Sequence, residues 1–393
     1  MYQSCWPSAT TTLAARYHRR AMTTTAHFIS QALGLAAQAL FLSNPNPRVG
    51  CVIATPDGRV LGQGFTQQAG GPHAEVMALR DAQAAGHDVR GATAYVTLEP
   101  CAHQGRTGPC CDALIAAGIG RVVGSIADPN PLVGGQGFAR LRAAGVAVEV
   151  GPGADQAREL NIGFFSRMVR GTPWVRLKVA ASLDGTTALA NGASQWITSA
   201  SARADGHAWR ARACAVLTGF GTVRSDNPRL DVREVATPRQ PQVVVIDSRL
   251  QTPPDAALFI AGRACTIYAG GTLDAEFAAR KAALQARGAA VVQLPNPQGK
   301  VDLHAMLIDL GRRGINELHV EAGHQLNGSL LREGLVDELL VYLAPKLLGP
   351  GLGMANIGPL SELAQAQALE FTSAERVGPD LRVLARVPGR GDF

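Results

Sequence analysis

The segments GGPHAEVMAL (residues 70–79) and LEPCAHQGRTGPCC (residues 98–111) decide how the first half of this chain folds. They supply one imidazole, His73, two thiols, Cys101 and Cys110, and a separate carboxylate, Glu75. These are the parts with which a protein holds Zn²⁺ through three ligands and leaves the fourth position to water. We therefore predict that His73, Cys101 and Cys110 bind zinc and that Glu75 is the catalytic acid and base.

Glu75 lies two residues after His73, where a carboxylate can take a proton from the zinc-bound water and pass it to a leaving amine. His73 follows Gly-Gly-Pro and Cys110 follows Gly-Pro, so each is expected at a helix start, where the dipole favours thiolate. This pattern is typical of a deaminase. A closed structural zinc site and a set of merely buried small residues remain alternatives, and Cys111 is a rival ligand to Cys110.

Eight residues separate Cys101 from Cys110, whereas the generic zinc-deaminase pattern ends in Pro-Cys-x-x-Cys. The insertion contains His103 and Arg106, which can donate charge-assisted hydrogen bonds to an anionic substrate. Upstream, the loop NPNPRVG (residues 44–50) offers Asn46. Asn46 either faces the edge of a pyrimidine or belongs to an ordinary Asn-Pro turn.

The composition indicates a globular protein in a reducing compartment. The chain has 393 residues, 46% of them hydrophobic, and this is longer than the segment that one hydrophobic core usually organises. Two domains are therefore expected. The net charge of +6 suits a phosphorylated ligand, but no dense block of Lys and Arg indicates nucleic acid binding. No apolar run is long enough to cross a bilayer. Seven scattered cysteines argue against a disulfide framework, and we expect a cytoplasmic protein.

Apolar strands alternate with helices from His27 to about Val150, which predicts a three-layer α/β/α sandwich with the zinc ligands beside strand ends. The alternation pauses around residues 161–172, and a second α/β series begins at Trp174. We expect residues 1–26 to be a disordered or mis-started extension, residues 27–170 to form the first domain, and residues 171–393 to form the second.

Two glycine-bearing turns follow strands of the second series. The turn GFGTVR (residues 219–224) lacks the third glycine of the dinucleotide-binding fingerprint. The turn EAGHQLNGS (residues 321–329) leads into a helix whose first amides could bind phosphate. From spacing alone, each is as plausibly a plain turn as a cofactor loop.

From about His27 onward, the chain resembles the family of bifunctional riboflavin-biosynthesis deaminase-reductases. The resemblance rests on six strings, which are NPNPRVG (44–50), HAE (73–75), TLEPCAHQGRTGPC (97–110), ASLDG (181–185), SQWIT (194–198) and VEAG (320–323). It implies a cytidine-deaminase-like domain that hydrolyses the exocyclic amine of a diaminopyrimidinone carrying a phosphoribosylamino group. A dihydrofolate-reductase-like domain would then use NADPH to reduce the ribosyl group to ribityl. We also expect a homo-oligomer, either a dimer or a tetramer.

The resemblance carries functional residues onto this sequence position by position. The family's NADPH contacts match Ala180, Trp196, Thr222, Asp226, Ser248, Gly323, Gln325, Asn327 and Ser329. Its substrate contacts match Ser194, Arg210, Leu230, Arg233 and Glu321, with Lys178 a further candidate beside the sugar. Arg210 and Arg233 would clamp the terminal phosphate.

One position departs from the family. Members often have a histidine seven residues before the zinc histidine, and this chain has Thr66 there. If that histidine helps to hold substrate, this chain must use Thr66, Gln67 or a water instead.

Two other functions stay open at this point. A nucleobase or tRNA-editing deaminase with a non-catalytic second domain would act on a polynucleotide and bind no NADPH. A zinc-stabilised binding module would show no catalysis at all.

Overall fold

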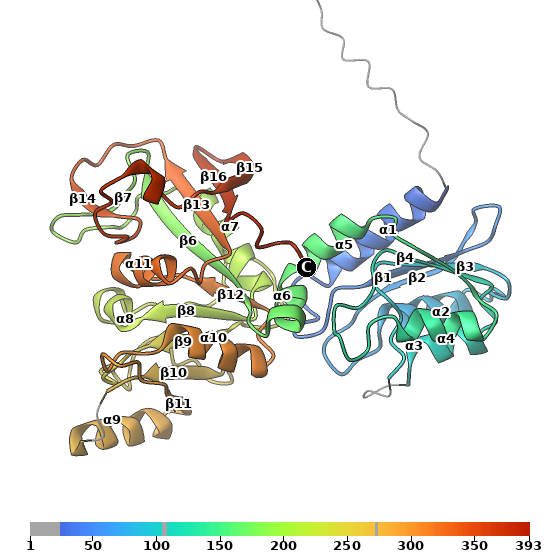
Figure 1. Cartoon of the computed structure of the whole chain (residues 1–393), viewed down its shortest axis with the longest axis horizontal. Helices are drawn as coiled ribbons and strands as arrows, with labels where there is room; N and C mark the ends of the chain where they lie inside the picture. The colour runs from blue at the N-terminus through green and yellow to red at the C-terminus, as the bar shows by residue number, and fades with distance from the viewer. Residues whose placement is uncertain (1–23, 104–107, 272–273) are drawn as a thin grey trace, which may run out of the picture.

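The computed structural model describes residues 24–103, 108–271 and 274–393, arranged as two α/β halves that meet at a narrow junction (Figure 1). One half is built on a five-stranded sheet and the other on a nine-stranded sheet. A small two-stranded ribbon, β7 (Thr186–Leu189) with β14 (Gly351–Gly353), lies beside the larger sheet.

The first half has the order β2-β1-β3-β4-β5, with β1 antiparallel to β2 and β3, and β3, β4 and β5 parallel. Helices cover both faces, α1 and α5 on one and α2, α3 and α4 on the other (Figure 1). The strands are β1 (Gly50–Ala54), β2 (Val60–Phe65), β3 (Thr93–Val96), β4 (Arg121–Gly124) and β5 (Ala147–Val150). The helices are α1 (Thr24–Gln38), α2 (Ala74–Ala84), α3 (Cys110–Ala116), α4 (Gln136–Ala143) and α5 (Ala154–Leu160). The predicted three-layer sandwich is confirmed.

Glycines in β2 let α2 press against the sheet. A Cβ on Gly62 would lie 2.3 Å from the carbonyl oxygen of Ala78, and one on Gly64 would lie 2.5 Å from the Cβ of Met77. No larger residue fits at this spacing. The close approach sets the position of α2, and with it His73 and Glu75, relative to β1.

The second half has the order β11-β10-β9-β8-β12-β6-β13-β16-β15. The strands from β11 to β13 are parallel, while β16 runs antiparallel to both β13 and β15. These strands are β6 (Trp174–Ser182), β8 (Ala215–Gly219), β9 (Gln242–Ile246), β10 (Cys265–Ala269), β11 (Ala289–Gln293), β12 (Glu317–Val320), β13 (Glu338–Ala344), β15 (Glu370–Val377) and β16 (Asp380–Arg386).

Helices pack on both faces of the larger sheet. Leu177, Leu217 and Leu318 share one core with Met306 of α10 (Leu303–Arg312) and Leu330 of α11 (His324–Arg332). The opposite face packs Val243 and Ile267 against Val223 of α8 (Phe220–Asp226) and Phe277 of α9 (Ala275–Ala286). On that second side, Ala202 of α7 (Ala200–Arg212) contacts Leu340 and Tyr342 of β13. A short 3₁₀ turn, η1 (Leu363–Gln365), precedes β15.

The structure adds elements that the sequence pattern did not predict. Helix α6 (Ile162–Arg170) occupies the stretch where the alternation seemed to pause, and it buries Phe164 and Phe165 in the core of the first half. Strand β15 escaped prediction because it lies at the edge of the sheet with most of its residues exposed. An edge strand of this kind carries no hydrophobic alternation to detect.

The two halves are joined through a buried carboxylate, Glu317 of β12. Its side chain is 1% exposed and receives three guanidinium groups, from Arg48 at 2.5 Å, Arg212 at 2.7 Å and Arg176 at 2.9 Å. Arg48 belongs to the loop before β1, so this ion pair crosses from one half to the other. Burial opposes ionisation, but the three arginines hold the pKa of Glu317 well below its usual range.

Further contacts close the junction around this charge. The side chain of Asn316 donates to the carbonyl of Pro45 at 2.7 Å, and the Arg48 amide donates to Asn161 at 2.7 Å. The last residue, Phe393, packs against Phe165 of α6 and Trp174 of β6. Figure 1 accordingly shows the carboxyl terminus at the junction.

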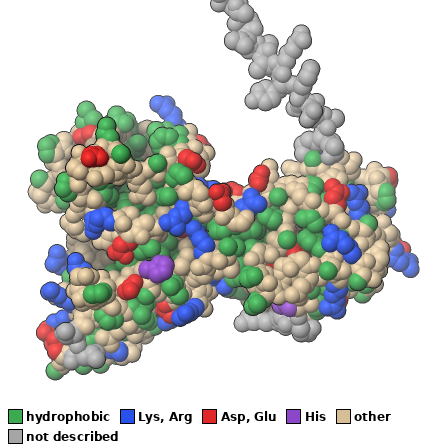
Figure 2. All heavy atoms as spheres, in the orientation of Figure 1, with side chains coloured by type: hydrophobic (Ala, Val, Ile, Leu, Met, Phe, Trp, Pro, Cys, Tyr) green, Lys and Arg blue, Asp and Glu red, His purple; other side chains and the backbone are tan. Residues whose placement is uncertain are grey.

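Within the described part of the chain, no helix combines the length and apolarity needed to cross a membrane. The face displayed in Figure 2 intersperses Lys and Arg with Asp and Glu, and no continuous basic block covers it.

We predict that Glu317→Gln destabilises the protein by about 3–5 kcal/mol, because it leaves the guanidinium groups of Arg48 and Arg212 without their counter-charge. Urea unfolding followed by circular dichroism measures the change. Asp88→Asn is the matched control, since it removes an acid from an exposed pair with Arg90 and should leave the unfolding midpoint in place. Equal midpoints for Glu317→Gln and the parent would contradict the role given to this carboxylate.

Candidate functional site

Three side chains of the first half that could bind a metal lie close together on the face of the sheet covered by α2, α3 and α4. His73 is the N-cap of α2, Cys110 is the first residue of α3, and Cys101 lies in the loop after β3. His73 Nδ1 is 3.3 Å from Cys110 Sγ and 3.6 Å from Cys101 Sγ. Among the described residues these three form the one group of such side chains able to hold a metal ion, with all ligand atoms within 4.8 Å of one another.

These separations fit a tetrahedral zinc ion. Zinc bonds to nitrogen and sulfur place the two ligand atoms about 3.6 Å apart at a tetrahedral angle. The observed distances agree, so the residues present could hold the ion without rearrangement. Cys111, the rival ligand, is buried and points its Sγ toward Asp112 Oδ1 at 3.8 Å, outside the group.

A buried glutamate fixes the loop that carries Cys101. Glu99 accepts hydrogen bonds from the amides of Asp128, Gly135, Gly137 and Phe138 at 2.8–3.2 Å. Gly137 has no room for a side chain, because a Cβ there would lie 1.9 Å from the carbonyl oxygen of Pro100. The loop is therefore clamped to the start of α4, which places the Cys101 thiol.

The electrostatics of the cluster favour a cation. Hydrogen bonds from Cys110 and His73 lower the pKa of Cys101 to about 4, and the Cys110 amide also donates to its sulfur at 3.3 Å. The hydrogen bond with Cys101, together with burial, raises the pKa of Cys110. A bound metal would displace protons from these thiols.

Glu75 lies beside this cluster without belonging to it. Its side chain is buried, and burial raises the pKa of its carboxyl group to about 7. Its nearest electrostatic partners are Cys101, His73 and Cys110. A carboxyl group that changes protonation near neutral pH next to a metal position is suited to moving protons.

The other residues predicted in the first half do not belong to this cluster. His103 is exposed, and Arg106 lies outside the described residues. The loop of Asn46 is tied to the second half by the neighbours of that residue, since Asn44 donates to the carbonyl of Arg212 at 3.0 Å. Thr66 is buried, and its hydroxyl already bonds the amide of Val49 at 3.2 Å. Thr66 therefore anchors β2 to this loop, which leaves its hydroxyl little freedom to bind substrate.

The second half brings the two glycine-bearing turns together. A Cβ on Gly323 would lie 3.8 Å from Thr222 Oγ1, and one on Gly219 would lie 3.1 Å from Leu326 of α11. Both turns follow the carboxyl ends of neighbouring parallel strands, β8 and β12, which is where open α/β sheets bind ligands. Helix α11 has Gly323 as its N-cap and no side chain capping it, so its first amides can meet a phosphate.

A charged cluster lies at the same edge of the sheet. Glu321 follows β12 and pairs with both Nε and Nη2 of Arg210, the latter at 2.8 Å. Lys178 Nζ lies 3.8 Å from the outer oxygen, Glu321 Oε2. Burial lowers the pKa of Lys178, against the attraction of Glu321. Lys178, Arg210 and Glu321, which the family resemblance assigned to the substrate site, thus form one ionic cluster.

The remaining predicted residues lie around this cluster. Arg233 is half-exposed and pairs with the buried Asp231, whose backbone oxygen accepts from Arg210 Nη1 at 3.0 Å. Leu230, between Arg229 and Asp231, is buried with a positive φ of 52°. Ser194 and Trp196 lie in the loop before α7, and the Trp196 indole is 61% exposed beneath the guanidinium of Arg203 at 4.4 Å. The other expected contacts are Ala180 on β6, Asp226 on α8, Ser248 after β9, and Gln325, Asn327 and Ser329 on α11.

Sequence reasoning missed three residues around this cluster, namely His319, Asp231 and Arg203, the last of which stacks on Trp196. Asp231 gives one carboxylate oxygen each to Arg229 and Arg233. His319 lies on β12 between Glu317 and Glu321. Three ionisable residues at alternate positions of a buried strand were the available signal, since they must share one face of the sheet.

Comparison with known proteins identifies both halves. Residues 22–126 match the family model of the cytidine and deoxycytidylate deaminase zinc-binding region, and residues 173–383 match that of the RibD C-terminal domain. The riboflavin biosynthesis protein RibD of Escherichia coli (strain K12) is 44% identical over 360 residues, which cover 90% of this chain and 97% of that protein.

Solved structures agree over the whole molecule. RibD of Acinetobacter baumannii superimposes with a TM-score of 0.82 at 39% identity, covering 93% of this chain and 99% of its own. A protein of Thermotoga maritima, described as a diaminohydroxyphosphoribosylaminopyrimidine deaminase/5-amino-6-(5-phosphoribosylamino)uracil reductase, gives a TM-score of 0.81 at 32% identity with the same coverage. The chain belongs to the RibD family of bifunctional riboflavin-biosynthesis enzymes, with a zinc-binding deaminase domain followed by a reductase domain.

Proposed function

We propose that this enzyme deaminates a diaminopyrimidinone carrying a phosphoribosylamino group at a zinc ion held by His73, Cys101 and Cys110. The geometry of these three side chains carries the proposal, because their ligand atoms lie at tetrahedral separations beside the buried Glu75. The substrate is taken from the name of the Thermotoga relative. We assign residues 27–170 to this deaminase domain, residues 171–393 to the reductase domain, and residues 1–26 to an extension outside both.

Glu75 moves the protons of the deamination. Zinc in such a site lowers the pKa of water so that it can attack the ring carbon near neutral pH. Glu75 accepts the protons that this water loses and delivers one to the ring nitrogen and one to the exocyclic nitrogen, which leaves as ammonia when its bond to the ring carbon breaks. Its burial next to His73 and Cys110 supports this role, because a carboxyl group with a raised pKa can both take and return a proton. Asn46, His103 and Arg106 are the proposed substrate contacts of this domain.

The reductase domain converts the ribosyl group to ribityl with NADPH, which supplies the hydride when bound. The paired turns at Gly219 and Gly323 support a nucleotide site there, because close backbone approach and uncapped helix amides suit a phosphate. The proposed NADPH contacts are Ala180, Trp196, Thr222, Asp226, Ser248, Gly323, Gln325, Asn327 and Ser329. The proposed substrate contacts are Lys178, Ser194, Arg210, Leu230, Arg233 and Glu321.

Lys178 and Glu321 are placed to manage protons at the sugar. The furanose must open before hydride can reach its first carbon, and this opening needs a proton on the ring oxygen. Lys178 faces Glu321 Oε2 at 3.8 Å, and together they form an acid and base pair at the edge of the site. Arg210 and Arg233, both linked to Asp231, would receive the terminal phosphate.

A homo-oligomer, a dimer or tetramer, is also proposed. Large apolar side chains are exposed around β14, η1 and β15, with Leu347 at 75%, Leu363 at 94% and Phe371 at 80%. Exposed apolar groups of this kind often become buried between subunits. The six described cysteines are free thiols, which supports a reducing, cytoplasmic location.

We predict that Glu75→Gln lowers the rate of ammonia release by a factor of about 10²–10⁴ while zinc content stays unchanged, because the carboxyl group moves protons and binds no metal. The parent enzyme, given the pyrimidine substrate and NADPH, should release ammonia first and oxidise NADPH second. The variant should still reduce the deaminated intermediate when this is supplied. Loss of both reactions in the variant would overturn the domain division, and absence of both in the zinc-loaded parent would overturn the proposed function.

We predict that Cys101→Ser and Cys110→Ser each lose zinc and lower the thermal midpoint of the deaminase half, because metal affinity contributes directly to folding. Metal analysis and calorimetry of the same preparations measure both effects. Cys111→Ser is the matched control, a neighbouring buried thiol that should keep full zinc content. Zinc retained in Cys110→Ser and lost in Cys111→Ser would reverse the ligand assignment.

We predict that Arg233→Ala raises KM for the phosphorylated intermediate by about tenfold or more with little change in kcat, because it removes one arm of a charge-assisted phosphate contact. The dephosphorylated intermediate serves as control, since its KM should be the same for parent and variant. An equal rise in KM for both compounds would place Arg233 elsewhere in the site.

A further inference from the structure

We propose that His319 is a positioning residue of the reductase site, where its neutral imidazole donates from Nε2 to Glu321 and holds that carboxylate in its working orientation. The inference rests on the proposed function of Glu321. It concerns a residue that touches neither substrate nor cofactor and acts only through its neighbour.

The imidazole is enclosed, and a carboxylate oxygen of Glu321 lies near its Nε2. His319 is 0% exposed, and within the described residues neither of its ring nitrogens has a hydrogen-bond partner. Its Nε2 lies 3.4 Å from Glu321 Oε1. A buried polar ring without a partner is costly, and a small reorientation that turns the Nε2 hydrogen toward Glu321 Oε1 would satisfy it. Glu321 is therefore the partner that would satisfy the hydrogen-bonding capacity of the His319 ring.

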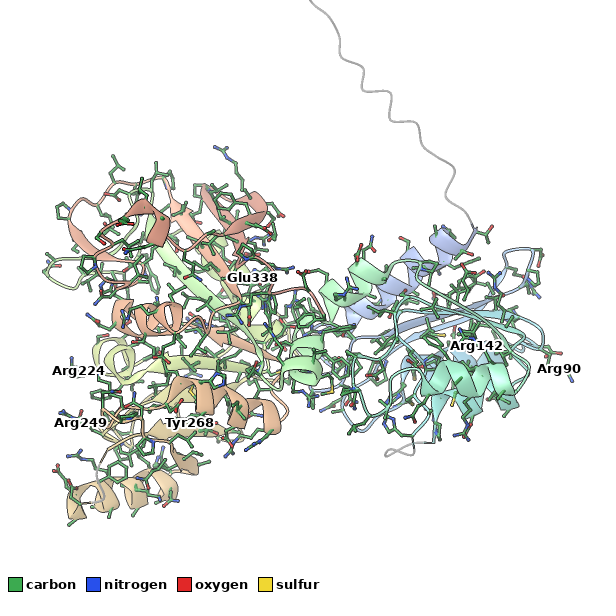
Figure 3. All side chains as sticks on the ribbon, viewed as in Figure 1. Arg90, Arg142, Arg224, Arg249, Tyr268 and Glu338 are labelled. Atoms are coloured by element: carbon green, nitrogen blue, oxygen red, sulfur yellow. The ribbon has the colours of Figure 1, made fainter. Side chains whose placement is uncertain are left out.

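The charges around His319 select its protonation state. On the neighbouring strand β6, Arg176 lies directly opposite His319. Its buried guanidinium is already paired with Glu317 and with Glu338, which Figure 3 labels. Burial lowers the pKa of His319, and the positive charges of Arg176 and Arg210 oppose a second proton, whereas Glu321 favours it. A neutral imidazole has one N–H, and the only carboxylate it faces at this distance is Glu321, so the proton belongs on Nε2.

The two oxygens of Glu321 are not equivalent. Oε1 receives Arg210 Nε and faces His319. Oε2 receives Arg210 Nη2 at 2.8 Å and faces Lys178. His319 therefore secures the inner oxygen, and the outer oxygen stays directed at Lys178 and the sugar. Without the imidazole, the carboxylate would keep its two-point contact with Arg210 but lose the support at Oε1, so the ion pair as a whole could shift and the outer oxygen would lose its fixed place.

Three substitutions separate this role from simple packing. Gln carries its amide nitrogen at the distance of Nε2, Asn carries it at that of Nδ1, and Leu fills the space without a donor. In the zinc-loaded full-length enzyme, we expect His319→Leu and His319→Asn to lower kcat for reduction of the supplied intermediate by about tenfold or more, with KM within about threefold. His319→Gln should recover most of the rate. NADPH affinity and ammonia release should equal those of the parent in all three variants, which shows that they fold.

A double-mutant cycle with Glu321→Gln completes the test. If His319 acts through Glu321, adding His319→Leu to Glu321→Gln changes kcat little further. The inference is overturned if the two losses multiply, if Gln rescues no better than Asn, or if His319→Leu reduces as fast as the parent. A parent enzyme that releases ammonia yet never oxidises NADPH would instead refute the proposed reductase function and the inference with it.

Discussion

A carboxylate can stay ionised inside a protein only when cations enclose it, and strand β12 carries two that depend on this condition. Glu317 begins the strand and Glu321 follows its last residue on the same face. Three arginines contact Glu317, whereas Arg210 and Lys178 contact Glu321. The first carboxylate binds Arg48 and so joins the deaminase half to the reductase half. The second binds Arg210 at the edge where the reductase site lies. The organisation of the second half, and its attachment to the first, follows from how these two charges are neutralised.

In the deaminase half, short-range contacts position the residues of the candidate zinc site. Each ligand lies at or beside a helix start or a strand end, and short contacts set those places, such as Glu99 with the amides before and in α4. Because the distances from His73 to the two cysteines match a tetrahedral ion, the fold presents a formed metal position. Glu75, buried beside it, then has an environment that keeps its proton exchangeable near neutral pH. The proposed metal ligands and the proposed proton carrier are thus positioned by separate contacts.

The junction also connects structural elements that lead to the candidate sites of both halves. The loop of residues 44–50 leads into β1 of the deaminase sheet and sends Arg48 into the reductase half. Thr66 is bonded to Val49 of this loop, so the position that departs from the family pattern acts as a structural tie in this chain. The buried end of β12 therefore touches the deaminase half, while its opposite end carries Glu321 of the reductase site.

The amino-acid sequence by itself determined the layered α/β class and singled out the proposed zinc ligands and Glu75, because these depend on short-range signals such as Gly-Pro breaks, helix starts and strand alternation. Helix α6 and edge strand β15 were not predictable in this way, since one serves as a connector between cores and the other has no buried face. Only the tertiary structure decided that Arg48 would meet Glu317, that Gly219 and Gly323 would adjoin, and that His319 would face Glu321. Those partners are far apart in sequence or depend on the twist and register of neighbouring strands, and no local pattern encodes which buried charges will meet.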